Sequence, residues 1–155
     1  MIPPAIAAIQ AMVSPAVLIT TSAVVGAGLA HLYGAANDRM RSMNRERLEL
    51  RESTDDAQTD ERIAEIDTQL AWLLERHFLL SRAVLFSYAA PLVLVLSVIA
   101  IAIGVGTRSQ GVGIVADVLV VAGAATLLVG LAYAARANLN SHNAIAYEVR
   151  RVRAL

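Results

Sequence analysis

Few residues of this sequence have the type and spacing that enzyme chemistry requires. The three histidines, His31, His77 and His142, lie far apart, in neither a metal-binding spacing nor a nucleophile–base spacing. The chain has no cysteine, which excludes thiolate ligands and thiol catalysis. The sequence therefore predicts no enzyme activity, no metal site and no cofactor.

The remaining candidates are polar residues inside long apolar segments. Asp117 is the only formally charged residue in such a segment, and an ionisable group inside a membrane is costly enough to be a functional candidate. Gln10, Ser14 and Thr21 fall within about 40° of one another around a helix. These four residues are the pore or ion candidates.

Two interpretations of these residues stay open. In the first, several copies assemble so that the first helix lines a central path, and Asp117 with Gln10 forms an acidic, cation-favouring ring near the outer mouth. In the second, Gln10 and Ser14 only hydrogen-bond Asp117 within one three-helix unit, or Asp117 reaches the outer membrane surface because it lies near a helix end.

The elements that carry these residues are three predicted transmembrane helices, at residues 4–35, 83–106 and 112–135. Each segment exceeds the roughly 20 apolar residues that cross a bilayer. Residues 107–111 form a connection so short that the second and third helices must be antiparallel. Of the 155 residues, 57% are hydrophobic and 17% charged, which excludes a soluble enzyme of this size. The predicted fold is an all-α polytopic membrane protein.

The arginines predict the orientation. All 13 basic residues are arginine, with eight in residues 36–82, four in residues 136–155 and Arg108 in the short connection. The positive-inside rule then makes 36–82 and 136–155 cytoplasmic and the N-terminus external. A cleaved signal peptide, with small residues at 28–30, is the alternative. It is disfavoured because the basic residues follow the apolar run, which is also too long.

Residues 36–82 predict a long cytoplasmic helical hairpin between the first two membrane helices. The first helix continues to about Glu52, with a break near Asn37 left open, and a second long helix returns from about Ala57. A 3-4 spacing typical of coiled coils is formed by Ile63, Ile66, Leu70, Leu73, His77 and Leu80.

Charge is sorted along this hairpin. Arg39, Arg41 and Arg45 lie near the first membrane helix, where they suit anionic lipid headgroups. The acidic stretch from Glu52 to Asp67 offers a surface to a cytoplasmic protein partner. A solvated helix face with i,i+4 pairs accounts for the same charges. The formal net charge of zero gives no reason to expect nucleic acid as a partner.

Small residues and prolines in the membrane helices predict how these helices bend and pack. Prolines inside the first two helices, Pro15 and Pro91, each remove a backbone donor and predict kinks. Small residues that let helices approach closely are Ser22, Gly26, Ala30, Gly34, Gly123 and Gly130. Three helices with such faces form a thin bundle, which predicts a homo-oligomer.

Three short stretches carry a resemblance to a known family: residues 10–19, the run 37–45 and residues 79–83, with matching positions at Gln10, Ser14, Pro15 and Arg45. They resemble a family of short bacterial membrane proteins known only as a domain of unknown function. The resemblance implies a bacterial inner-membrane protein with three helices and a charged cytoplasmic segment. It implies no activity or ligand.

The sequence thus predicts a homo-oligomeric integral membrane protein of the bacterial inner membrane that forms an ion- or solute-conducting pore. The alternative is a non-conducting scaffold or sensor whose cytoplasmic coiled coil docks a partner protein.

Overall fold

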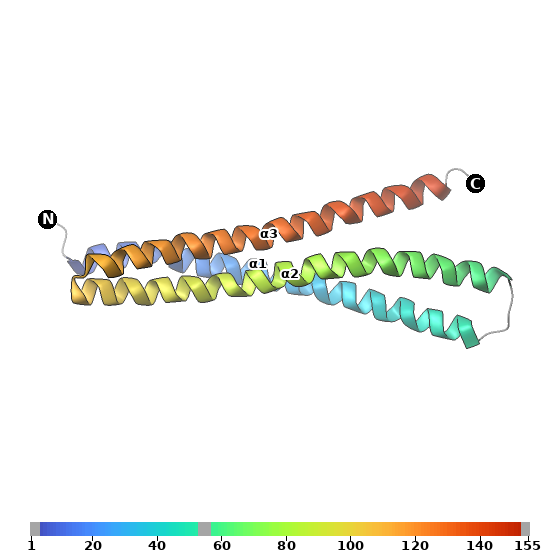
Figure 1. The fold of residues 1–155 in the computed structure, drawn as a ribbon, viewed down its shortest axis with the longest axis horizontal. Coiled ribbons are helices and arrows are strands. Elements are labelled where there is room, and N and C mark those ends of the chain that lie inside the picture. The colour runs from blue at the N-terminus through green and yellow to red at the C-terminus, as the bar shows by residue number, and fades with distance from the viewer. Residues whose placement is uncertain (1–3, 53–56, 153–155) are drawn as a thin grey trace. The chain divides into compact units, whose positions relative to one another are not determined.

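The chain forms three long α-helices in a computed structural model that describes residues 4–52 and 57–152. They are α1 (Pro4–Glu52), α2 (Ala57–Thr107) and α3 (Gln110–Val152) (Figure 1). Each helix contains a segment long and apolar enough to cross a membrane. The protein is therefore all-α with three membrane-capable helices, which is consistent with a membrane location.

The helices extend beyond the apolar segments that predict them. α1 continues through Asn37 to Glu52, so the break left open at Asn37 does not occur. α3 continues past residue 135 to Val152, through part of the predicted tail. The prolines at 15 and 91 both lie inside helices rather than at their ends. A helix satisfies its backbone groups internally, which a membrane requires of any segment that spans it.

The connection between α2 and α3 is shorter than the predicted loop 107–111. Arg108 adopts a left-handed conformation with φ of 55°, and the Ser109 amide donates to the Gly104 carbonyl at 3.3 Å. This pairing terminates α2 as a Schellman motif. The Ser109 carbonyl then accepts from the Gly113 amide at 3.3 Å, which makes Ser109 the cap of α3. Gln110 and Gly111 are consequently part of the first turn of α3.

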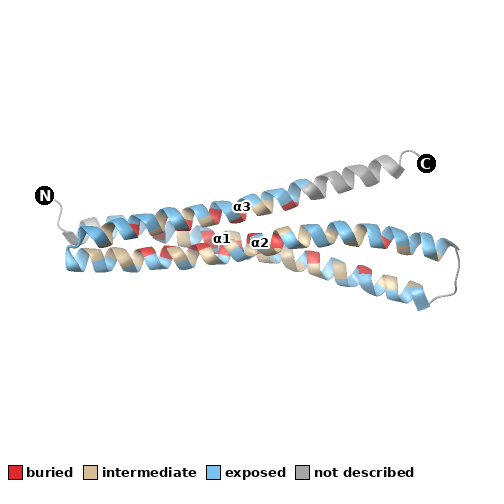
Figure 2. Ribbon diagram, viewed as in Figure 1, coloured by how far each residue is buried: buried red, intermediate tan, exposed pale blue. Residues whose placement is uncertain are grey.

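The chain divides into two compact units, and each takes a section of all three helices. The first unit comprises Met1–Leu29 and Ala83–Ala132, and the second comprises Ala30–Arg82 and Tyr133–Leu155. Within each helix many buried positions recur every seven residues (Figure 2). They are Pro15, Ser22, Leu29, Ala36 and Met43 on α1, Leu80, Ser87 and Leu94 on α2, and Ala116, Gly123, Gly130 and Ala137 on α3. A seven-residue repeat is typical of helices that pack nearly parallel or antiparallel.

The first unit is packed through small residues. The Ser87 hydroxyl on α2 donates to the Ser22 carbonyl on α1 at 3.5 Å, and both residues are buried. On α3, a Cβ added at Gly123 would lie 2.7 Å from Leu94 of α2. The helices of this unit therefore approach more closely than larger side chains would permit.

The second unit has a small apolar core of Ala36, Leu80 and Ala137, with Tyr33 and Leu79 packed against it. Of the predicted coiled-coil positions, Ile66 and Leu80 are buried, and the other four are half-buried. These positions lie on the inner face of α2 in this unit. The coiled-coil geometry itself stays a prediction, as does the cytoplasmic location of the hairpin.

Candidate functional site

The candidate site is an open groove of about 660 Å³ in the first unit, referred to below as the Asp117 groove. All three helices contribute to it. Its lining residues are Ala11, Ser14 and Pro15 of α1, Ile101, Gly104 and Val105 of α2, Ser109 of the turn, and Gly113, Ala116, Asp117, Val120 and Val121 of α3. The turn between α2 and α3 borders this groove, because the lining residues Gly104 and Ser109 form the hydrogen bond that ends α2.

Asp117 supplies the only formal charge among the residues that line this groove. It also borders a second, smaller groove of about 390 Å³, whose other residues are Val118, Val121, Ala122 and Ala125 of α3. Asp117 is exposed, and within residues 4–52 and 57–152 its carboxylate has no hydrogen bond and no ion pair. The carboxylate is therefore available to water or to a cation.

The structure brings together two of the four pore candidates. Ser14 and Asp117 line the same groove from α1 and α3. Gln10 is exposed on α1 and is not a lining residue, and Thr21 uses its hydroxyl to donate to the Val17 carbonyl of its own helix at 2.9 Å. Neither Gln10 nor Ser14 hydrogen-bonds Asp117 in the described part of the chain. The polar face predicted for α1 thus reaches the groove only at Ser14.

The groove is large enough to hold water around the carboxylate. Its volume of about 660 Å³ is far larger than the roughly 10–15 Å³ that a single water molecule needs. Apart from Asp117, Ser14 and Ser109, its lining side chains are apolar or absent. Such a surface can hydrate a cation and offer it one anionic ligand, whereas an anion would find no basic side chain there.

The remaining residues predicted to pack or bend the helices occupy different environments. Ser22, Gly26, Gly123 and Gly130 are buried. Ala30 and Gly34 are half-buried, and a Cβ added at Gly34 would meet nothing within 4 Å. Pro15 is fully buried and lines the Asp117 groove, whereas Pro91 is half-buried.

Ion pairs join α1 to α2 in the second unit. Arg47 Nε lies 2.7 Å from Asp67 Oδ1, and Arg62 Nη2 lies 2.9 Å from Glu46 Oε1. Arg62 Nη1 also pairs with Glu65 at 2.8 Å, one turn along α2. Hydrogen bonds from Arg62 to Glu46, and then to Glu65, raise the pKa of the guanidinium above its usual value. Some of the charged residues in 36–82 therefore form ion pairs with one another within the second unit.

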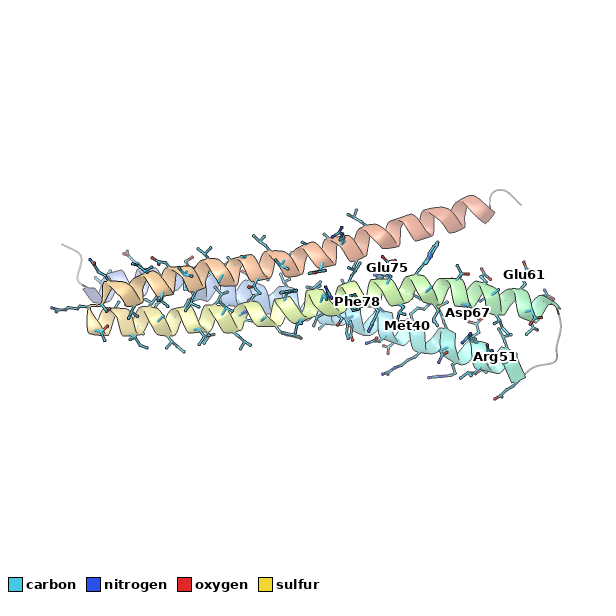
Figure 3. The ribbon with its side chains drawn as sticks, in the orientation of Figure 1. Met40, Arg51, Glu61, Asp67, Glu75 and Phe78 are labelled. Carbon is cyan, nitrogen blue, oxygen red and sulfur yellow. The ribbon has the colours of Figure 1, made fainter. Side chains whose placement is uncertain are left out.

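A second surface feature of this unit is a groove of about 580 Å³ between α1 and α2. Its lining residues are Met40, Arg41, Asn44, Arg47, Asp67, Leu70, Ala71 and Leu74 (Figure 3 labels Met40 and Asp67).

The headgroup candidates Arg39, Arg41 and Arg45 are all exposed on α1. Within the described residues no group of three or more His, Cys, Asp or Glu lies close enough together to hold a metal ion.

Comparison with known proteins places the chain in a family. A family model described as "Protein of unknown function (DUF2721)" matches residues 12–147. The chain belongs to this family. The match covers α1 from its third turn, all of α2 and most of α3, so the DUF2721 domain includes sections of both units. No curated protein and no solved structure matches the chain.

Sequence reasoning did not find Ser109 or the pair formed by Tyr33 and His77. Ser109 lines the Asp117 groove, and a serine in the short connection just before an apolar helical run is an N-cap signal that would have located it. The Tyr33 and His77 rings stack with centroids 4.7 Å apart, and Tyr33 Oη lies 3.4 Å from His77 Nε2. These two residues are 44 positions apart, and no local pattern predicts their contact.

Proposed function

We propose that this protein assembles in a membrane as a homo-oligomer and forms a cation-selective pore, with the Asp117 groove at one mouth. The observation that carries the proposal is the Asp117 carboxylate, which lies on an open, three-helix groove and has no hydrogen-bond or ion-pair partner in the described part of the chain. A carboxylate in lipid without a partner is costly, so it requires water, a cation or a donor from another copy. A water-filled path between copies provides the first two.

The outer surface of the first unit supports assembly. Large apolar side chains are exposed on all three helices, including Val17, Leu92 and Leu128. Lipid or another copy of the chain is suited to cover such side chains, whereas water is not. The proposed orientation has the turn at Arg108 outside, because most arginines lie beyond the opposite ends of the apolar segments. The proposed location is the bacterial inner membrane, which the resemblance of residues 10–19, 37–45 and 79–83 implies.

Conductance in liposomes tests the proposal. Purified protein in vesicles with a KCl gradient should pass current, and the reversal potential should report preference for K⁺ over Cl⁻. Asp117→Asn should move that potential toward zero because it removes the only charge of the groove. Asp38→Asn is the matched control, since Asp38 is an exposed acid outside the groove. Vesicles that contain oligomers larger than the 16.4 kDa monomer and pass no current would refute the pore.

A second candidate function is a scaffold or sensor that docks a basic protein partner through the second unit. The observation in its favour is that several exposed acids form no ion pair in the described part of the chain, namely Glu49, Glu52, Asp60 and Glu61. A photocrosslinker at position 61 should then capture a basic protein, and neutralising the other three acids should abolish capture. Crosslinks that join only copies of this chain would refute this function.

A further inference from the structure

A cluster of arginine and aromatic side chains in the second unit is separate from the Asp117 groove. The Arg82 guanidinium carbon lies 4.6 Å from the ring centroid of Phe78, one turn earlier on α2 (Figure 3 labels Phe78). It lies 5.8 Å from the ring centroid of Tyr133 on α3, and Arg82 Nη1 donates to Tyr133 Oη at 3.4 Å. Two rings and one hydrogen bond thus hold the guanidinium in a defined position.

No acid in the described part of the chain neutralises the positive charge of this cluster. Arg82 is exposed and forms no ion pair with an acid in the described residues. Arg136 lies three residues after Tyr133, which places it on the same side of α3, and it too is exposed without an acidic partner there. Of the five N–H groups of Arg82, one donates to Tyr133, and the other four form no hydrogen bond in the described residues and can donate to an anion.

The position of these arginines in the sequence indicates where the anion is. Residues 83–106 contain no charge and residues 112–135 contain only Asp117, so Arg82 and Arg136 are the first basic residues beyond two membrane-length segments. Residues that flank such segments belong in the headgroup region of a bilayer, and an arginine fork suits phosphate oxygens.

Exposed apolar side chains in the same cluster favour a lipid over a free anion. Phe78 is 57% exposed, and Leu139, one turn beyond Arg136, is 67% exposed. A soluble phosphate would leave these side chains in water, whereas an acyl-bearing molecule covers them.

We propose that Arg82 and Arg136, positioned by Phe78 and Tyr133, bind the phosphate of an anionic phospholipid. This site lies on α2 and α3 and is distinct from the exposed arginines of α1. It does not depend on conduction, so a failure of the pore proposal leaves it intact.

Native mass spectrometry of the full chain with phosphatidylglycerol and phosphatidylcholine of the same acyl chains tests the site. The unmodified protein should retain phosphatidylglycerol preferentially. Arg82→Gln and Arg136→Gln should each reduce that preference by about tenfold, as expected when a charge-assisted hydrogen bond is lost. Arg51→Gln is the matched control, because it removes the same charge from an exposed position at the end of α1 (Figure 3).

Circular dichroism shows whether each variant keeps its helices. If Arg82→Gln loses helicity, Arg136→Gln decides, because Arg136 forms no hydrogen bond or ion pair in the described residues. An unchanged preference in Arg136→Gln, or an equal loss in Arg51→Gln, would overturn the site. Excess inorganic phosphate should leave the lipid bound. Displacement of the lipid by inorganic phosphate would overturn the assignment to a lipid.

Discussion

Replacing Gly123 with alanine tests whether close contact between α2 and α3 stabilises the first unit. The new Cβ would lie 2.7 Å from both Cγ and Cδ2 of Leu94, which is itself fully buried. Overpacking of this kind costs about 1–3 kcal/mol, and alanine recovers about 0.5–1 kcal/mol of helix propensity. We expect a net loss of about 1–2 kcal/mol in the free energy of unfolding.

Gly113→Ala is the matched control on the same helix, because a Cβ at Gly113 meets nothing within 4 Å. It should stabilise the protein by about 0.5–1 kcal/mol through propensity alone. The assay is unfolding of the detergent-solubilised protein by sodium dodecyl sulfate, followed by far-ultraviolet circular dichroism. Combining Gly123→Ala with Leu94→Ala should cost less than the sum of the two single losses, since the removed side chain makes room for the new methyl group.

Two outcomes would refute this reasoning. The first is a Gly123→Ala midpoint equal to or above that of Gly113→Ala. The second is a double variant whose loss equals the sum of the two single losses, because residues that clash must show coupling. Either result would mean that α2 and α3 do not depend on the close approach at Gly123.

Two further predictions concern the second unit. Arg62→Met removes the pairs to Glu46 and Glu65 and should cost only about 0.2–1 kcal/mol, because these exposed pairs are screened by solvent and salt. The folded-state pKa of Arg62 is raised, so its contribution to stability is complete below the unfolded-state pKa and is lost only as the pH rises through the folded-state pKa. Arginine stays protonated far above pH 9, so the cost of Arg62→Met measured by sodium dodecyl sulfate unfolding should not change between pH 7 and pH 9. Tyr33→Phe should cost about 0.5–1.5 kcal/mol in the same assay, because it loses the hydroxyl near His77 but keeps the stacked ring. A cost for Arg62→Met that changes between pH 7 and pH 9, or a Tyr33→Phe variant as stable as the unmodified protein, would contradict these two assignments.

The helices were predictable because their signals are local. Charge-free segments of membrane length locate the apolar part of each helix, and the absence of proline from residues 36–52 and 57–82 allows α1 and α2 to continue beyond it. The turn was less predictable. Gln110 and Gly111, the last residues of the predicted loop, belong to α3 because Ser109 caps that helix directly before them. This cap depends on the left-handed backbone of Arg108.

The candidate site was predictable only in part. The cost of burying charge singles out Asp117 from the sequence, and helical spacing places Ser14 on one face with Gln10 and Thr21. Only Ser14 of these three lines the groove. Thr21 bonds its own backbone instead, which is an option for any threonine in a helix and leaves no trace in a spacing pattern.

The sequence by itself determined the class of this protein: three helices long and apolar enough to cross a membrane, with the charge gathered outside them. The length, hydropathy and charge of a segment are sums over its residues, so they follow from the sequence without knowledge of any tertiary contact. The tertiary structure decided which small residues pack, since Gly123 meets Leu94 while Gly34 meets open space. It also brought Arg82 to Tyr133 across 51 residues. Such contacts depend on the rotation and register of one helix against another, which no single helix encodes.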